Sequence, residues 1–311
     1  MIRVRRLPLV PTARKVGACG EQTGAMNDQT LSTPDGRVIG YADYGPEAGT
    51  AVLWCHGGPG SRLEPAAVAA AAAAAGLRII GIDRPGYGLS SPIPERTIAD
   101  WVPDGLAVAD ALDIDQFVTV GCSTGGAYAL ALAALAPARV LGVVACCALT
   151  DMRWAEGRST MSGPASIGIW DASDRDAALK IATETFGEDG SKMLSAGDAP
   201  AVELAPTDLA LFADPSFLAG MAAAIPAMFA QGVQGYVDDR RADGPGWESF
   251  DVGAITCPVI VVHGGSDTIC AVVQAHHTAE IVPNAELRVS PELGHFSVMS
   301  EVQPAVLDLL R

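Results

Sequence analysis

The feature that most constrains the fold of this chain is the segment GCSTGG at residues 121–126. It follows an apolar, β-branched run at 117–120 and precedes an alanine-rich run at 127–135 that favours a helix. A strand that turns at once into a helix leaves room only for small neighbours, which explains the glycines two residues before and after Ser123. Such a turn strains the serine backbone and lifts its hydroxyl to the positive end of the helix. We therefore predict that Ser123 is a catalytic nucleophile.

Strand-like and helix-like runs alternate on both sides of this segment. The strand-like runs are Arg37–Tyr44, Ala51–Cys55, Leu77–Ile82, Phe117–Val120, Val140–Cys146, Val259–Val262 and Glu286–Val289. The helix-like runs between them are Glu64–Ala75, Ile98–Leu112, Thr124–Ala136, Ala271–Ile281 and Val302–Leu310. Each helical run is long enough to cross from one parallel strand to the next. This order predicts an α/β fold with a mostly parallel central sheet and helices on both faces.

The alternation stops near residue 149 and returns at Cys257. The stretch between contains loops rich in glycine, proline and aspartate, no clear strand, and helix-like runs such as Asp174–Phe186, Pro206–Phe212 and Pro215–Ala230. We expect residues 151–256 to form a helical cap inserted into a core made of residues 26–150 and 257–311. Residues 1–25 are basic and lack the apolar segment of a secretory signal, so we expect a disordered extension there.

Three further loops carry residues suited to acyl transfer. The segment HGGPG at 56–60 follows a strand, and because Pro59 has no N–H, Gly58 is the expected oxyanion donor beside the Thr124 amide. Asp267 emerges at the carboxyl end of the strand 259–262, where parallel sheets hold ligands, and is the expected acid. His295 lies in a glycine-containing loop after the last strand and is the expected base. Asp151 remains the alternative acid.

The chain order Ser123, Asp267, His295 resembles the order of the α/β-hydrolase superfamily and differs from the trypsin and subtilisin orders. The resemblance covers about residues 30–150 and 255–311. It implies an α/β-hydrolase fold in which Ser123 attacks a carbonyl carbon, His295 takes its proton and Asp267 orients the imidazole. Water then hydrolyses the acyl-enzyme. The resemblance implies no metal and no organic cofactor.

We expect the other histidines, the cysteines and the Asp83–Arg84 pair to have no catalytic role. Asp83 and Arg84 are expected to brace loops, as are His56 and His263. His276 and His277 lie in the middle of a helix-like run, where we expect both to be solvated. The seven cysteines show no C-x-x-C spacing and lie mostly in apolar runs, which predicts buried thiols in a reducing, cytoplasmic compartment and no zinc site.

Net charge and apolar run length exclude several partners. The formal net charge of −16 disfavours nucleic acid and anionic membranes, and no apolar run is long enough to span a bilayer. The expected partner is a small-molecule ester, and a homodimer is left open. A substrate carboxylate would need a cation, and the cap offers Arg153, Arg158, Arg175, Lys180, Lys192, Arg240 and Arg241.

The sequences of the Ser123 turn and of the HGGPG loop narrow the class of hydrolase. Epoxide hydrolases and haloalkane dehalogenases carry aspartate at the position that Ser123 occupies here, so Ser123 disfavours both. The HGGPG loop resembles that of proline iminopeptidases, but those carry GGSWG and DQRG motifs where this chain has GCSTG and DRPG. Pro59 also departs from the HGGG loop of lipases. We favour a carboxylic-ester hydrolase for small or medium soluble esters, with lactones and aromatic monoesters, as in monoalkyl phthalate hydrolases, among the candidates.

Three alternatives stay open. The first is an aminopeptidase of the proline iminopeptidase type. The second is another enzyme with the same triad, which could be a C–C bond hydrolase, a lactonase, a thioesterase or a perhydrolase. The third is a small-molecule binder that retains the triad without turnover.

Overall fold

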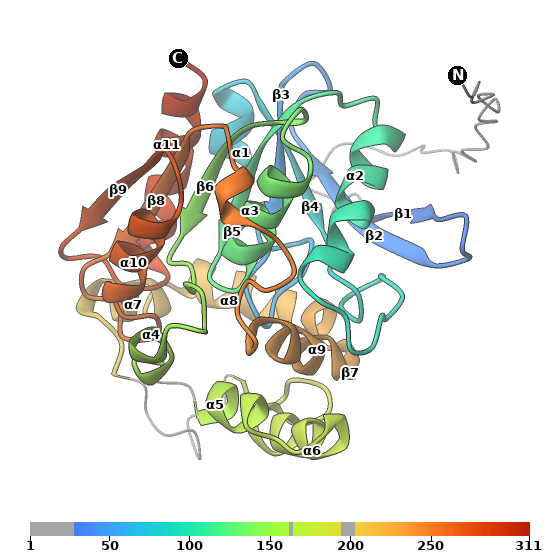
Figure 1. The fold of residues 1–311 in the computed structure, drawn as a ribbon, viewed down its shortest axis with the longest axis vertical. Coiled ribbons are helices and arrows are strands. Elements are labelled where there is room, and N and C mark those ends of the chain that lie inside the picture. Colours follow the sequence, from blue (N-terminus) through green and yellow to red (C-terminus); the bar gives the residue numbers. More distant parts are fainter. Residues whose placement is uncertain (1–27, 162–163, 194–202) are drawn as a thin grey trace.

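The computed structural model describes residues 28–161, 164–193 and 203–311. The expected extension at residues 1–25 lies outside this part of the chain. The described residues form a central sheet, helices on both of its faces, and a group of helices beyond one end of its strands (Figure 1).

The sheet has eight strands in the order β1-β2-β4-β3-β5-β6-β8-β9. Their bounds are β1 Asp28–Ser32, β2 Val38–Tyr44, β3 Thr50–Cys55, β4 Leu77–Ile82, β5 Phe117–Cys122, β6 Val140–Cys146, β8 Val259–Gly264 and β9 Ala285–Ser290. β2 runs antiparallel to β1 and to β4, and all remaining pairs are parallel. The prediction of an α/β fold with a mostly parallel sheet is therefore confirmed. Strand β1 has no counterpart in the sequence-based prediction.

Alternate residues of each central strand enter opposite apolar cores. In β3, Leu53 and Cys55 join one buried cluster, whereas Val52 and Trp54 join the other. The first cluster lies under three helices, α2 (Val102–Ala111), α3 (Gly125–Leu135) and α10 (Val273–Ile281). The second lies under α1 (Ala66–Ala74) and α11 (Val302–Leu309). Both faces of the central strands are thereby buried.

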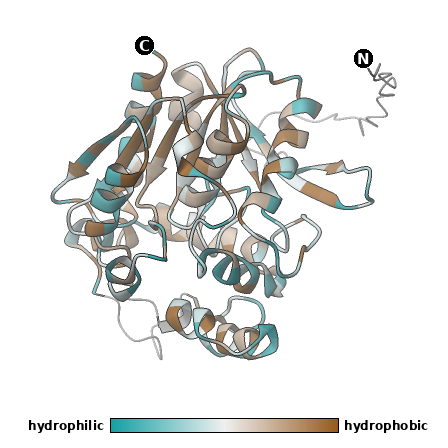
Figure 2. Ribbon diagram, in the orientation of Figure 1, coloured by the Kyte–Doolittle hydropathy of each residue, from teal (hydrophilic) through white to brown (hydrophobic). Residues whose placement is uncertain are grey.

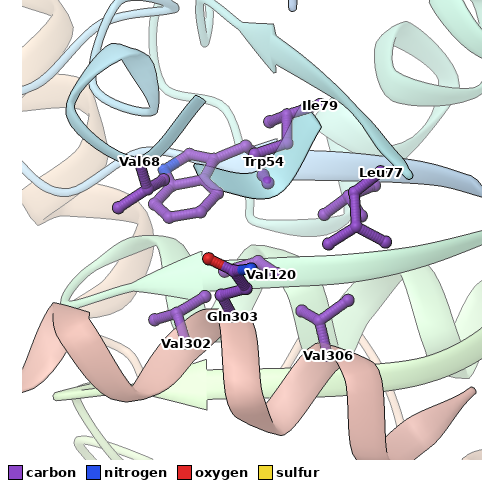
Figure 3. Close-up of a pocket in the computed structure, with 10 residues that line it drawn as sticks. Trp54, Val68, Leu77, Ile79, Val120, Val302, Gln303 and Val306 are labelled. Atoms are coloured by element: carbon purple, nitrogen blue, oxygen red, sulfur yellow. The ribbon is translucent and has the colours of Figure 1, made fainter. Parts of the chain in front are cut away.

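Packing between α11 and the sheet leaves one small gap. Figure 3 shows it among the side chains of Trp54, Val120, Val302 and Val306, and its volume is about 10 Å³. A space of this size holds at most about one water molecule. The gap is therefore a packing feature of the second core and has no room for a substrate.

The chain between β6 and β8 forms a separate group of short elements. Their bounds are α4 Ala155–Ser159, α5 Pro164–Trp170, α6 Arg175–Phe186, α7 Pro206–Phe212, α8 Pro215–Met228, β7 Ala230–Val233 and α9 Gln234–Asp243. Figure 1 shows α5 and α6 as the part farthest from the sheet, with α9 between them and the sheet. We refer to residues 151–256 as the cap.

Strand β7 corrects the expectation that the cap contains no strand. Its four residues, AQGV, include a single β-branched residue, so they carry no alternating pattern from which a strand could be predicted. Helix α8 accordingly ends at Met228 and does not reach Ala230. No single helix in the described ranges is long and apolar enough to cross a membrane, although α7 and α8, bent by 77°, meet that criterion by length and composition when counted together.

Helix α9 is hydrophilic in sequence and yet buried. Its sequence is QGYVDDRRAD, and it is strongly teal in Figure 2, but Asp238, Asp239, Arg240 and Asp243 are all buried. Burying charged groups is unfavourable unless each one is paired or hydrogen-bonded. The partners of these residues therefore determine how the cap meets the core.

Candidate active site

Ser123 lies in the sharp turn between β5 and α3 and has a positive φ of 53°. A left-handed conformation is unusual for serine, and the space around it explains the flanking glycines. A Cβ atom on Gly121 would lie 2.3 Å from the carbonyl oxygen of Gly125, and one on Gly125 would lie 2.0 Å from that of Cys55. The two glycines therefore allow the turn to pack against the neighbouring strand.

The two expected oxyanion donors lie side by side. A Cβ on Gly58 would lie 2.7 Å from Oγ1 of Thr124, and one on Gly57 would lie 3.7 Å from Cβ of Ser123. The Gly57 amide donates to Glu64 at 2.8 Å. Within the described ranges, neither the Gly58 amide nor the Thr124 amide donates a hydrogen bond. We therefore still expect these two N–H groups to bind a ligand oxygen near Ser123.

Asp267 and His295 form a buried pair at the same edge of the sheet. Nδ1 of His295 lies 2.8 Å from Oδ2 of Asp267, whose Oδ1 accepts from the amides of Ile269 and Cys270 at 2.8 and 2.9 Å. Burial pushes the pKa of Asp267 upward, but His295 and His263 outweigh burial and hold it below its usual value. Asp267 is therefore ionised, and Nε2 of His295 is the ring atom left to take a proton.

The alternative acid, Asp151, lies elsewhere. Its carboxylate accepts from the side chain of Arg153 and from the amide of Trp247 at 3.2 Å. The structure thus places Asp267, and not Asp151, on His295.

No hydrogen bond joins Ser123 to His295 within the ranges that the structure describes. Burial raises the pKa of the Cys270 thiol, and the nearby Ser123 side chain opposes that rise. Catalytic hydrogen bonds are often loose without substrate and tighten in the complex. The distance between serine and histidine therefore depends on what holds the His295 loop.

The bracing residues predicted from sequence hold the oxyanion loop. Arg84 is fully buried, and its guanidinium donates to the carbonyl oxygens of His56 and Gly57, at 2.9 Å for the latter. Nε2 of His56 accepts from the Arg84 amide at 3.2 Å. Burial, together with the Arg84 charge, holds the pKa of His56 well below its usual value, so this ring is neutral. Asp83 accepts from the Arg62 amide at 2.7 Å.

His263 and His277 also make contacts with neighbouring residues. His263 is a buried brace, with Nε2 2.8 Å from the carbonyl oxygen of Cys270. His277 corrects the expectation of a solvated side chain, because it stacks on Trp154 at 4.1 Å and Nδ1 lies 2.7 Å from Oγ1 of Thr150. Trp154 comes from the cap, so helix period alone could not reveal this contact. His276 is exposed, as expected.

Asp239 of α9 is a structural residue that sequence reasoning missed. This fully buried carboxylate accepts from the guanidinium groups of Arg84 and Arg96 and from the hydroxyls of Tyr87 and Tyr128, both at 2.9 Å. Burial raises the pKa of Asp239, but the two cations reverse that effect and hold it well below its usual value. The only available signal was a charged run, DDRRAD, which is typical of a solvated helix face.

Arg240 is the cap cation that reaches the catalytic turn. It is buried, donates to Oγ1 of Thr124 and pairs with Asp243, whose pKa burial raises to about 6. Other expected substrate-binding cations pair with acids, namely Arg153 with Asp151, Arg158 with Asp171, Arg175 with Asp238 and Arg241 with Glu95. Arg240 therefore supports the oxyanion turn, and its charge is already matched. In the described ranges, no cluster of His, Cys, Asp and Glu could hold a metal ion.

Gly125→Ala tests the steric account of the turn. The new methyl group would overlap the Cys55 carbonyl oxygen, so we expect a loss of about 1–3 kcal/mol in the free energy of unfolding. The control is Gly220→Ala in α8, where nothing lies within 4 Å and a gain of about 0.4–1 kcal/mol is expected. Urea unfolding measures both variants. Equal effects of the two substitutions would contradict this account.

Asp239→Asn tests the buried charge cluster. We expect a loss of about 3–5 kcal/mol at pH 7, because two buried guanidinium groups lose their counter-charge. The folded-state pKa of Asp239 lies below its unfolded value of about 3.9, so its contribution is complete above about pH 5 and declines as the pH falls further. Urea unfolding at pH 7 and pH 3 should show a smaller difference in the free energy of unfolding between wild type and variant at pH 3. A difference independent of pH would refute a stabilising role for the ionised Asp239.

Comparisons with known proteins support the fold described above. The 2-hydroxymuconate semialdehyde hydrolase of Pseudomonas putida is 28% identical over 289 residues, which cover 89% of this chain and 94% of that protein. A non-heme haloperoxidase of Rhodococcus erythropolis is 25% identical over 285 residues, covering 90% and 97%. An esterase from Rhodococcus sp. ECU1013 superposes with a TM-score of 0.61 at 23% identity and covers 91% of this chain and 100% of that one. A family model for the alpha/beta hydrolase fold matches residues 50–302, and the protein therefore belongs to the α/β-hydrolase fold family.

Proposed function

We propose that this protein hydrolyses a carboxylic ester of small or medium size through an acyl-enzyme on Ser123. The observation that carries the proposal is the buried His295–Asp267 hydrogen bond of 2.8 Å, at the sheet edge where Ser123 is held in a strained turn. A strained serine beside a histidine that is oriented by an ionised carboxylate is suited to nucleophilic catalysis.

Each step of the proposed reaction uses a group at this edge. The Ser123 oxygen attacks the carbonyl carbon as Nε2 of His295 accepts its proton, and Asp267 stabilises the resulting imidazolium. The new oxyanion accepts hydrogen bonds from the amides of Gly58 and Thr124. His295 then protonates the leaving alkoxide, which leaves an acyl group on Ser123. A water molecule, deprotonated by His295, attacks that group and releases the acid and free Ser123.

The two unpaired amides support an acyl-transfer reaction in particular. Donors already aimed at the position where negative charge develops need no reorganisation during the reaction. Losing one such donor typically costs about 3–4 kcal/mol of transition-state stabilisation. Gly58 and Thr124 offer two donors, and the Arg84 contacts to the carbonyls of residues 56 and 57 hold the Gly58 loop in place.

A second candidate is hydrolysis of a carbon–carbon bond. It is supported by the name of the Pseudomonas putida relative, a semialdehyde hydrolase that matches along most of both chains. The same serine and histidine would serve this reaction, so the choice between the two depends on the substrate.

Ser123→Ala should abolish ester turnover and leave the fold intact. The measurement is hydrolysis of p-nitrophenyl esters of increasing chain length, beside prolyl and leucyl p-nitroanilides and 2-hydroxymuconate semialdehyde, the compound named for the Pseudomonas putida relative. The matched control is Ser159→Ala, an exposed cap serine, which should keep the wild-type rate. Undiminished turnover by purified Ser123→Ala protein would refute the proposal. Cleavage of the prolyl anilide alone would favour an aminopeptidase, and cleavage of the semialdehyde alone would favour a C–C hydrolase.

Asp267→Asn should reduce kcat by about 10⁴-fold, because asparagine favours the wrong tautomer of His295. Asp151→Asn replaces an acid that pairs with Arg153 and should change kcat little. Steady-state kinetics on the best ester compare the two variants. A large loss in Asp151→Asn with little loss in Asp267→Asn would move the triad acid to Asp151.

A further inference from the structure

Asp208 of the cap binds the backbone of the His295 loop. It lies in α7 and is 1% exposed. Its Oδ2 accepts from the His295 amide at 2.8 Å. Its Oδ1 accepts from the amides of Phe296 and Ser297 at 3.2 and 2.8 Å and from the Ser297 hydroxyl at 2.7 Å. One cap carboxylate thus accepts hydrogen bonds from three consecutive amides, the first of which belongs to His295, the expected catalytic base.

The loop is shaped to receive this carboxylate. A Cβ atom on Gly294 would lie 2.3 Å from Oδ2 of Asp208, so the residue before His295 has no room for a side chain. The amide of Gly294 donates to Oγ of Ser297 at 2.8 Å. The Ser297 amide begins the next turn, and its acceptor is Asp208, which lies 89 positions earlier in the chain.

Three further contacts join α7 to the same loop. Oγ1 of Thr207 donates to the carbonyl oxygen of Glu292 at 2.9 Å and lies 3.0 Å from Oγ of Ser297. The rings of Phe212 and Phe296 pack edge to face at 5.1 Å. Because polar contacts and ring packing occur on both sides of His295, α7 cannot leave without releasing the loop.

His295 is thereby held by two carboxylates at two different points. Asp267 binds the ring at Nδ1 and sets its orientation, whereas Asp208 binds the backbone amide and sets its position. Proton transfer requires His295 to lie at hydrogen-bond distance from Ser123, so the position of this loop matters for the proposed reaction.

We propose that Asp208 is a positioning residue through which the cap keeps His295 within reach of Ser123, so that the base is in place only while α7 is docked. This inference rests on the proposed function, in which His295 takes the proton of Ser123. A misplacement of about 1 Å can cost about 10²-fold in rate. We therefore expect removal of Asp208 to lower kcat by about 10²-fold and to change KM by less than about 3-fold.

The test compares Asp208→Ala with Asp208→Asn, which keeps one acceptor oxygen and the side-chain volume. The matched control is Asp214→Ala, which removes another cap aspartate that caps α8 at Ser216 and does not touch the His295 loop. The readouts are kcat and KM on the best p-nitrophenyl ester, hydrogen exchange of the amides at 295–297, and urea unfolding. We expect a large loss of kcat and faster amide exchange at 295–297 in Asp208→Ala, and a smaller loss of kcat in Asp208→Asn. In Asp214→Ala, kcat and the exchange at 295–297 should keep their wild-type values.

Two results would overturn the proposal. One is a kcat of folded Asp208→Ala, or of Asp208→Asn should the alanine variant not fold, within twofold of wild type. The other is unchanged exchange at 295–297. An inactive wild-type protein would refute the proposed function instead, and the exchange measurement would still decide whether Asp208 holds the loop.

Discussion

The buried carboxylate of Asp239 is the interaction on which the arrangement of cap and core depends. It is surrounded by two guanidinium groups and two phenol hydroxyls, and all four donors come from the core. A helix as hydrophilic as α9 could not be buried without them, because desolvated charges are unfavourable unless paired. The polar sequence of α9 is therefore a docking surface that fits one position on the core.

The cap acts on three parts of the core that belong to the proposed site. Asp239 holds Arg84, which in turn binds the carbonyls of the oxyanion loop. Arg240 binds the side chain of Thr124, directly after the proposed nucleophile Ser123. Asp208 binds the backbone of His295. Glycines of the core provide the space for the turns, and charged residues of the cap fix the loops in that space.

The sequence predicted those parts of the fold and site that depend on local pattern. The strand–turn–helix at Ser123 is marked by glycines two residues before and after the serine, although the atom that Gly125 avoids belongs to the distant Cys55. The alternation of strands and helices follows from burial on both sheet faces. Strand β7 was missed because four residues carry no period. Asp239 and Asp208 were missed because their partners are distant, with Arg84 155 residues from Asp239 and His295 87 residues from Asp208. A charged side chain shows its partner only in three dimensions.

In the reaction that we propose, Ser123 carries the acyl group during turnover. Rapid-quench mass spectrometry with the fastest p-nitrophenyl ester tests it most directly. We predict a mass increase of one acyl group on the peptide that contains Ser123, formed and lost at rates compatible with kcat and missing from Ser123→Ala. Turnover with no adduct at any time, or with the acyl group on Cys270 instead of Ser123, would contradict the account.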